Sequence, residues 1–308
     1  MAHAALQSQP RQQITVGSSQ NIKSDDKYVL ARGYAAASRL NLQHYLWKET
    51  QRYLLHPWVR EQLRTSAETG HHKVADLATG TGIWLLDLSR SAELQDLALA
   101  LHGFDISSMQ FPHAAWLPEN LSFDVGDILT DPPNELWGTF DLVHIRLVVL
   151  VARQLDDPRR IIRHVHKLLK PGGILQWEEV EPLGHHRILV REGAGIDTST
   201  TEMDEIFGVV TKAFDFTWVT QIPSLLGQEG FTDAVQHFCD PPPVLYQALT
   251  CSQLNVLDEL SHSDVMAGDR GVQFRNKIEA AYLEASAGSA AGACTQVSPT
   301  ITVARKAF

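Results

Sequence analysis

A glycine-rich turn is the first segment whose residue types could do chemistry. In residues 74–84 (VADLATGTGIW), an apolar stretch ends near Asp76, and Gly80 and Gly82 come directly before a second apolar stretch. Glycine has no Cβ, so the backbone can turn sharply at these positions and approach a ligand closely. An ordinary tight strand-to-helix connection would have the same composition, so the turn alone is only a weak indication of a binding site.

Two carboxylates follow the next two predicted strands. Asp105 ends the strand in LHGFDIS, and Asp127 follows the strand in FDVGDIL. Open α/β sheets bind ligands at the carboxyl ends of their strands, where an acidic side chain can accept hydrogen bonds from both hydroxyls of a ribose. A carboxylate after the third strand could accept from an adenine amino group. Each residue alone could be a solvated loop charge, but together with the turn they favour an adenosine-containing ligand.

The spacing excludes the commonest phosphate-binding patterns. A dinucleotide fingerprint needs Gly-x-Gly-x-x-Gly, and counted from Gly80 its third glycine position holds Leu85. The pattern Gly-x-x-x-x-Gly-Lys-Ser/Thr is also absent around this turn. We therefore expect a cofactor that contains adenosine but no phosphates.

Alternating apolar and amphipathic stretches position these residues. After His72 they predict βαβ units and a parallel sheet, which is an α/β fold. Before Pro57, the segment 33–56 is predicted to be a helix with an apolar stripe of Leu42, Tyr45, Leu46, Tyr53 and Leu54. Strands are predicted at 73–77, 99–105, 121–125, 139–145, 174–180, 231–238 and 300–304, and further helices at 58–65, 82–91, 157–169, 252–261 and 274–287.

The domain organisation follows from these changes of pattern. We expect a flexible tail over 1–26, a helical cap over 27–70, and one α/β domain over 71–308 with cap insertions near 184–220 and 244–297. Aromatic side chains in the cap could line a pocket for a hydrophobic small molecule. We name Tyr34, His44 and Trp218 as candidate substrate contacts, although residues of this kind could equally form the core of the cap.

Composition narrows the class of partner. The net charge of −10 would repel the phosphate backbone of a nucleic acid, so we expect no nucleic-acid partner. No apolar run is long enough to cross a membrane, and the three cysteines are sparse, so we expect a cytoplasmic protein with no membrane partner. We also expect a monomer or a homodimer. The histidine pairs at 71–72 and 185–186 lack the helical spacing of a metal site, and we predict no metal.

The order of these segments resembles class I S-adenosylmethionine-dependent methyltransferases. The resemblance covers residues 73–182 through VADLATGTGIW, LHGFDIS, VGDIL, FDLVHIRL and LLKPGGILQWEEVEP, and EGFTDAVQHF and PTITVARKA are similar to the last two antiparallel strands of that family. SRLNLQHYLWKETQRYLLHP and DISSMQFP further resemble fungal secondary-metabolite methyltransferases that act on small molecules. The family implies a Rossmann-like seven-stranded sheet, parallel with an antiparallel last strand, plus a helical cap.

The resemblance also implies a cofactor, S-adenosyl-L-methionine, and the residues that bind it. Ala78 stands where the family has its first glycine. The implied cofactor-binding residues are Asp76, Ala78, Thr79, Gly80, Gly82, Asp105, Ile106, Met109, Asp127, Ile128 and His144.

The implied reaction is methyl transfer to a small-molecule acceptor, by O- or N-methylation. It needs alignment of the acceptor with the activated methyl group and exclusion of water. A hydroxyl acceptor usually needs a general base as well, whereas a neutral amine does not. Glu178 and Glu179 are neighbours on a predicted strand, so their side chains point to opposite faces and at most one of them faces the cleft directly. The candidate bases are His144, Glu178 and His185, with Glu179 and His186 as further possibilities.

Two other functions are compatible with the same residues. The chain could be a regulatory protein that keeps the methyltransferase fold, or a catalyst that binds the cofactor and promotes a reaction other than methyl transfer.

Overall fold

The structure is a computed structural model. It describes residues 30–66, 71–152, 157–180, 187–189, 205–206, 208, 215–262, 269–291, 294–296 and 299–308. The predicted tail over 1–26 and the candidate bases His185 and His186 lie outside the described residues.

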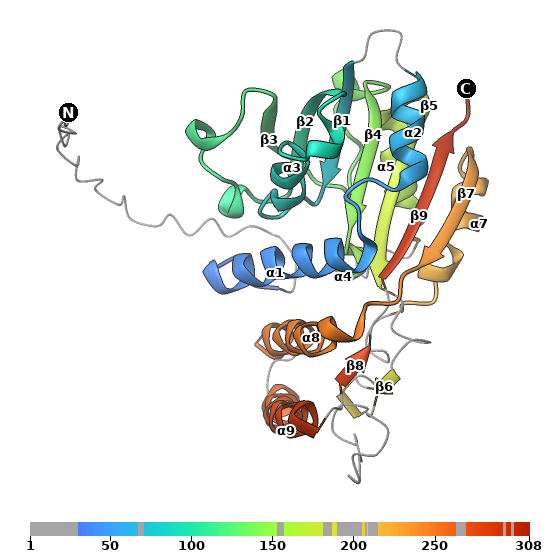
Figure 1. Cartoon of the computed structure of the whole chain (residues 1–308). Coiled ribbons are helices and arrows are strands. Elements are labelled where there is room, and N and C mark those ends of the chain that lie inside the picture. Colours follow the sequence, from blue (N-terminus) through green and yellow to red (C-terminus); the bar gives the residue numbers. More distant parts are fainter. Residues whose placement is uncertain are drawn as a thin grey trace, which may run out of the picture.

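A seven-stranded sheet forms the centre of the molecule (Figure 1). Its spatial order is β3-β2-β1-β4-β5-β9-β7. β9 runs antiparallel to both of its neighbours, whereas β1 to β5 pair in parallel. This confirms the predicted Rossmann-like sheet. The strands are β1 (His71–Leu77), β2 (Ala98–Asp105), β3 (Leu121–Val125), β4 (Phe140–Arg146), β5 (Leu169–Val180), β7 (Phe231–Phe238) and β9 (Pro299–Lys306).

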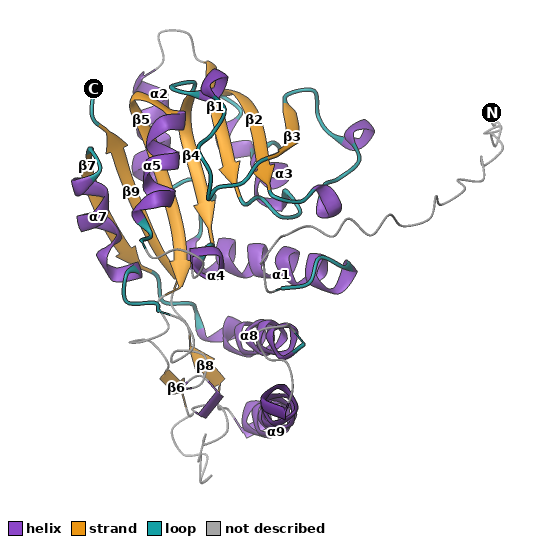
Figure 2. Cartoon of the chain, turned by 180° about the vertical axis from the view of Figure 1, so that it is seen from behind, coloured by secondary structure: helices purple, strands orange, loops and turns teal. Residues whose placement is uncertain are grey.

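Helices cover both faces of the sheet. α2 (Pro57–Ser66) and α3 (Ile83–Leu88) pack on one face, while α5 (Arg159–Leu168) and α7 (Ile222–Gln228) pack on the other (Figures 1 and 2). The apolar stripe of α5 is buried as its spacing predicts, and with the short α4 (Val149–Ala152) it belongs to the larger apolar cluster. A second apolar cluster lies under α2 and α3.

Three further helices are stacked beyond the carboxyl ends of the strands. α1 (Tyr34–Gln51) crosses these ends directly, and α8 (Tyr246–Ser261) and α9 (Asp269–Ala291) follow beneath it, beside a small sheet of β6 (Arg187–Leu189) and β8 (Cys294–Gln296) (Figure 1). Among the described residues, no helix has both the length and the apolar composition needed to span a bilayer. Short 3-10 helices occur at Ala92–Leu94, Ser108–Gln110, Ala114–Trp116, Asn134–Leu136, Val219–Gln221 and Pro243–Leu245.

The buried surface of α1 differs from the predicted apolar stripe. Leu42 and Tyr45 are 40% and 46% exposed, whereas Arg39 and His44 are buried. The helix ends at Gln51 and does not continue to residue 56. The prediction of the stripe was wrong at Leu42 and Tyr45 because α1 lies against the polar ends of the strands, where charged and hydrogen-bonding side chains are its partners.

Candidate functional site

A cleft of about 330 Å³ opens at the carboxyl ends of β1 to β4, beside α1. The cleft lies where the strand order reverses, because β2 and β3 lie on one side of β1, and β4 lies on the other side. This point is the usual ligand site of an open α/β sheet. Nine of the eleven predicted cofactor residues line this cleft, namely Asp76, Ala78, Thr79, Gly80, Asp105, Ile106, Asp127, Ile128 and His144.

The turn after β1 has a left-handed backbone at three positions. The φ angles of Ala78, Gly80 and Gly82 are 54°, 57° and 71°. For Ala78 this conformation costs about 1–2 kcal/mol relative to glycine. A Cβ on Gly82 would lie 2.2 Å from the ring of Phe123, so Gly82 is needed for packing against β3 and does not itself line the cleft.

Asp105 and Asp127 approach the same cleft from the ends of β2 and β3. The Asp105 carboxylate accepts hydrogen bonds from the amides of Gly80 at 2.9 Å and Ser107 at 3.1 Å, and burial raises its pKa. Asp127 Oδ1 accepts from the amide of Leu129 at 2.8 Å. A carboxylate has about four acceptor sites, so each of these groups can still bind hydroxyl or amino groups of a ligand.

His144 lies beneath the turn, completely buried. Its Nδ1 is 2.7 Å from Asp76 Oδ1, its Nε2 is 3.4 Å from Glu178 Oε1, and its ring stacks on Trp84 with centroids 3.7 Å apart. Burial disfavours the imidazolium, but the hydrogen bonds and charges of Asp76 and Glu178 outweigh burial and raise the pKa of His144. Both ring nitrogens of this buried side chain face carboxylates of the chain, and the role of His144 as a base stays a prediction.

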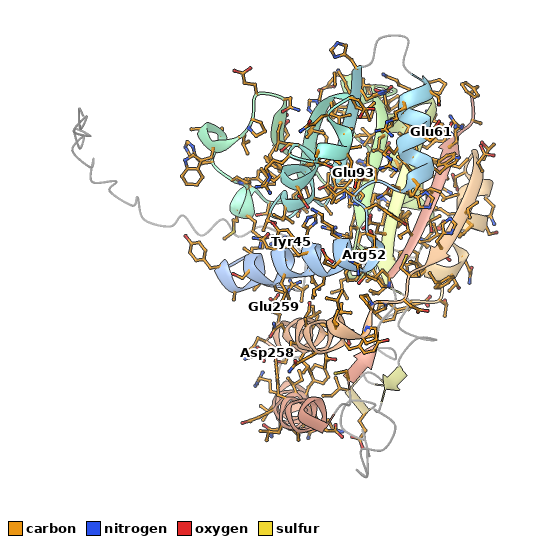
Figure 3. The ribbon with its side chains drawn as sticks, viewed as in Figure 1. Tyr45, Arg52, Glu61, Glu93, Asp258 and Glu259 are labelled. Carbon is orange, nitrogen blue, oxygen red and sulfur yellow. The ribbon has the colours of Figure 1, made fainter. Side chains whose placement is uncertain are left out.

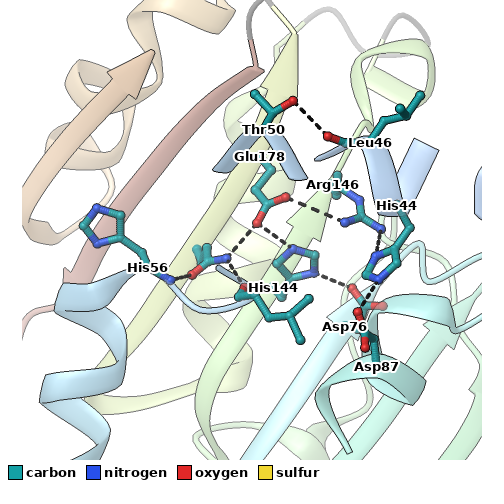
Figure 4. Close-up of polar contacts among 11 residues, drawn as sticks. His44, Leu46, Thr50, His56, Asp76, Asp87, His144, Arg146 and Glu178 are labelled. Carbon is teal, nitrogen blue, oxygen red and sulfur yellow. Dashed lines mark hydrogen bonds and ion pairs between the residues drawn. The ribbon is translucent and has the colours of Figure 1, made fainter. Parts of the chain in front are cut away.

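The polar contacts continue from His144 to α1 (Figure 4). Glu178 Oε2 is 3.8 Å from Arg146 Nη1, Arg146 Nη2 is 3.2 Å from His44 Nδ1, and His44 Nε2 is 2.9 Å from Asp87 Oδ2. Asp87 also accepts a hydrogen bond from Lys48 at 2.7 Å. We call these seven residues the ionic network; they are Asp76, His144, Glu178, Arg146, His44, Asp87 and Lys48.

His44 connects the two halves of the network as a neutral ring. Burial and the nearby Arg146 charge lower the pKa of His44 to about 4, against the opposing effect of Asp87. Arg146 can only donate and the Asp87 carboxylate can only accept, so His44 carries its proton on Nε2 and accepts from Arg146 at Nδ1. His44 is completely buried within this network, and the predicted contact with a substrate does not fit its position.

Glu179 points to the other face of β5, as strand alternation predicts. Its Oε1 accepts hydrogen bonds from the Val148 amide at 2.8 Å and from Trp177 Nε1 at 3.2 Å. Burial raises the pKa of Glu179 to about 8. Both Glu178 and Glu179 are buried, at 1% and 0% exposure, so neither presents a free carboxylate to an acceptor.

The comparisons with known proteins agree with this geometry. Residues 74–173, which carry the turn, Asp105, Asp127 and His144, match the family model of the methyltransferase domain. This segment is a methyltransferase domain. Methyltransferase grgD of a Penicillium species is 37% identical over 161 residues, which are 50% of this chain and 52% of that protein. N-methyltransferase gliN of Aspergillus fumigatus is 32% identical over 158 residues, 51% of each chain.

The matched part is about half of these curated relatives. The alignments with grgD and gliN span 52% and 51% of their lengths. Among solved structures, phosphoethanolamine N-methyltransferase 2 of Haemonchus contortus in complex with S-adenosyl-L-methionine superposes with a TM-score of 0.44 at 14% identity, covering 80% of this chain and 51% of that one.

Three of the predicted residues lie away from the cleft of the methyltransferase domain. Tyr34, the first residue of α1, is 95% exposed, and Met109 is 75% exposed. Trp218 is buried in the apolar cluster, where its ring lies 5.7 Å from that of Trp177. None of the three is among the residues that line the cleft, and their contacts with cofactor or substrate stay predictions.

Several residues that line the cleft were not predicted from the sequence. Arg146 follows the fourth strand in HIRL, and a cation directly after a strand of the ligand-binding edge was a usable signal. Other lining residues contributed by α1 and by the turn after β2 lie in the segments SRLNLQHYLWKETQRYLLHP and DISSMQFP, which carry the resemblance to fungal methyltransferases. In the described part of the chain, no group of three or more His, Cys, Asp or Glu side chains could hold a metal ion. The additional lining residues are Ala31, Arg32, Arg39, Leu40, Gln43, Thr81, Ile83, Gln110, Gly126, Leu129, Arg146, Leu147 and Val151.

Proposed function

We propose that this chain binds S-adenosylmethionine and transfers its methyl group to a small molecule. The observation that carries the proposal is the meeting of the Gly80 turn, Asp105 and Asp127 in one cleft of the methyltransferase domain. The absence of a third glycine at Leu85 makes a dinucleotide a poor alternative.

Each end of the cleft has a role in this proposal. Asp105 would accept hydrogen bonds from the ribose hydroxyls, and Asp127 would accept from the adenine amino group. Ile106, which is 42% exposed beside Asp105, would pack against the adenine ring. The backbone of the Gly80 turn would surround the methionine part, since no Cβ obstructs an approach there.

The cofactor would supply a methyl group on a positively charged sulfur, and the chain would supply alignment and a dry site. The activated methyl group would be accepted by a lone pair of the small molecule, and a neutral amine acceptor would lose its surplus proton to solvent afterwards, so it would need no base from the chain. α1 lies across the opening, with Leu40 only 3.1 Å from the position that a Gly80 Cβ would occupy. A helix seated this closely on the turn would exclude water from the sulfonium.

We propose a small secondary metabolite as acceptor, following the resemblance of SRLNLQHYLWKETQRYLLHP and DISSMQFP to fungal methyltransferases. grgD is named a methyltransferase, and gliN and tcpN of Claviceps purpurea are named N-methyltransferases, which makes a nitrogen or oxygen atom the proposed acceptor. We further propose a cytoplasmic location, a monomeric or homodimeric state, and no nucleic-acid partner, the last supported by the net charge of −10.

Calorimetry with S-adenosylhomocysteine tests the cofactor. We expect micromolar binding, about −8 kcal/mol, and no binding of NADH. Asp105→Ala should lose about 1.5–3 kcal/mol of binding free energy for each hydrogen bond removed, without unfolding. Binding of NADH in place of S-adenosylhomocysteine would contradict the proposal.

A turnover assay tests the reaction. Mass spectrometry with methyl-labelled cofactor and candidate metabolites should show label in a product. Cofactor binding without label in any metabolite would instead favour the regulatory alternative, and cofactor-dependent conversion without label would favour a reaction other than methyl transfer.

A further inference from the structure

Glu179 is a buried carboxyl group that lies outside the cleft and has no part in the proposed reaction. Its side chain is completely buried, and Oε1 accepts hydrogen bonds from the Val148 amide at 2.8 Å and from Trp177 Nε1 at 3.2 Å. Oε2 is also buried and has no hydrogen-bond partner among the described residues. Burying a polar atom without a hydrogen bond costs free energy, and burying an unpaired charge costs far more, so this geometry favours the protonated carboxyl group.

No cation balances the Glu179 carboxyl group. Within the described part of the chain, no Lys, Arg or His side chain forms an ion pair with it. The neighbouring α4 has the sequence VLVA, and the register partner of Glu179 on β9 is Thr300. Glu178 and Arg146 are register partners that contact each other on the opposite face of the sheet. Burial accordingly raises the pKa of Glu179 to about 8, against the opposing effect of the Trp177 indole and nearby amides.

The Val148 amide joins Glu179 to the wall of the cleft. Val148 follows Leu147, which lines the cleft and has a left-handed backbone with a φ of 56°. The Val148 carbonyl in turn accepts hydrogen bonds from the amides of Val151 and Ala152 at 2.8 Å, and Val151 also lines the cleft. A left-handed leucine persists only where its surroundings hold it, so the hydrogen bond from Val148 to Glu179 is one of the contacts that fix this part of the wall.

Loss of the Glu179 proton would disturb this arrangement. The ionised group would have no counter-ion among the described residues and one oxygen without a donor, so only water entering from outside could stabilise it. Water can enter only if neighbouring segments move apart. With four residues, α4 is the shortest of the described α-helices, and we expect it to move first. Its displacement would carry Leu147 and Val151 away from the cleft.

We propose that Glu179 is a positioning residue whose proton keeps Leu147 and Val151 in the arrangement that binds the cofactor. The proposal rests on the function proposed above, which supplies the ligand, and Glu179 itself touches no ligand. Because the pKa of Glu179 is raised to about 8, the protonated form predominates below this pH and is lost as the pH rises through it. An ordinary glutamate is already ionised above about pH 5 and would cause no change in this range.

Calorimetry with S-adenosylhomocysteine at pH 7 and pH 9 tests the coupling. If only the protonated chain binds, the apparent affinity is reduced by the protonated fraction, so the wild type should lose about tenfold between these pH values. Glu179→Gln keeps an oxygen that accepts from the Val148 amide and has no proton to lose, so its affinity should change much less. The amino group of the ligand titrates equally with both chains, and the ratio of their affinities therefore isolates Glu179.

Glu93→Gln is the matched control, because it makes the same substitution at the surface. Glu93 lies beside α2, where it pairs with Arg60 at 2.8 Å, and it does not line the cleft (Figure 3). The affinity of this variant should fall with pH as that of the wild type does. Circular dichroism at pH 9 should show that all three chains are folded, which distinguishes a loss of affinity from unfolding.

A spectroscopic readout needs no cofactor. The indole N–H of Trp177 donates to Glu179, so its NMR signal should shift with pH, with a midpoint near pH 8. The backbone amide signals of Leu147 and Val148 should shift with the same midpoint. Glu179→Gln should abolish all three shifts, and the loss of one indole signal in Trp177→Phe assigns the Trp177 signal.

The outcomes separate this inference from the proposed function. The same pH dependence of affinity in the wild type and in Glu179→Gln would overturn the inference. A Trp177 signal that titrates while the Leu147 signal does not would also overturn it, since the proton would then not affect the cleft wall. If neither chain binds S-adenosylhomocysteine at any pH, the proposed function fails, and the Leu147 and Val148 signals still decide whether the proton holds the wall.

Discussion

Glu178 and Glu179 are neighbours in the chain, and both are buried, yet their surroundings favour opposite charge states. Glu178 faces His144 and Arg146, and although burial opposes ionisation, these two groups lower its pKa. Glu179 faces the apolar cluster, where neutral donors such as Trp177 and the Val148 amide contact it, and burial raises its pKa to about 8.

The difference shows how one strand end can serve two environments. On the face of Glu178 the sheet carries the ionic network, which connects the turn after β1 to α1. On the face of Glu179 the carboxyl group accepts hydrogen bonds that hold the start of α4, next to Leu147 of the cleft wall. The stability of the structure around Glu178 therefore depends on a balance of opposite charges. The stability of the structure around Glu179 depends on this side chain being neutral.

The largest effect is expected at Glu178. Glu178→Gln removes a carboxylate from a buried network and leaves the charges of His144 and Arg146 poorly compensated, so the free energy of unfolding should fall by about 3–5 kcal/mol. Urea denaturation measures this. Glu93→Gln is the control, because Glu93 pairs with Arg60 at the surface, and its loss should stay below about 1 kcal/mol. Similar losses in the two variants would show that the network is not balanced by Glu178.

Glu179→Gln should raise the free energy of unfolding, whereas Glu178→Gln should lower it. With a folded pKa of about 8 and an unfolded value near 4.5, the folded chain holds a proton that the unfolded chain has lost, so stability falls as pH rises between these values. Glutamine keeps the acceptor oxygen and has no proton to lose. Relative to the wild type, the variant should gain at least about 1 kcal/mol between pH 5 and pH 8. Denaturation curves at both pH values check this, and a constant difference would mean that Glu179 is ionised throughout.

Ala78 lies where the two faces meet. It packs against the apolar cluster, and it begins the turn in which Thr79 donates to Asp76 of the network. Ala78→Gly should relieve its left-handed backbone and raise the free energy of unfolding by about 0.5 kcal/mol, the strain relief being partly offset by the greater freedom of unfolded glycine. Thermal unfolding of Ala78→Gly and of Gly80→Ala should give opposite results, because Gly80→Ala introduces the same backbone strain and should destabilise the chain. A loss in Ala78→Gly would mean that packing of the methyl group outweighs strain.

The smallest effect is expected at the solvent end of the network. Lys48 is 37% exposed and contacts Asp87. Lys48→Met should cost about 0.5 kcal/mol at low salt, and the cost should shrink at high salt because exposed charges are screened. A loss of several kcal/mol that does not change with salt would show that Lys48 behaves like the buried residues of the network.

Much of the sheet could be predicted because strand periodicity is a local property. The strands at 121–125 and 231–238 were predicted with the observed bounds. For the other strands, most of the predicted ends lie within a few residues of the observed ends. The meeting of Gly80, Asp105 and Asp127 in one cleft was predictable for the same reason, since these residues directly follow or end such strands.

The side of the cleft formed by α1 could not be predicted in detail because its contacts depend on packing between distant segments. His44 and Asp87 are 43 positions apart, and Arg39 and Glu259 are 220 apart. A helical wheel assigns α1 an apolar face through Leu42 and Tyr45, but the partner that covers α1 is polar. Tyr34 and Trp218 were chosen for their aromatic character, which does not distinguish a ligand contact from an exposed helix start or a core residue.

The pairing of β7 with β9 has a consequence for how such a protein can be modified. The chain leaves the sheet at Phe238 and returns at Thr300, and these two residues are register partners. Everything between them, including α8 and α9, is thus a module whose two ends are already adjacent, and insertions at closely spaced ends are tolerated well in proteins. A different module could be grafted at the same pair of residues with the sheet left intact. The module also contacts the rest of the molecule through the Arg39–Glu259 pair, through the pairing of β8 with β6, and through apolar residues of α8 and α9 in the larger cluster, so a graft would have to replace these contacts as well.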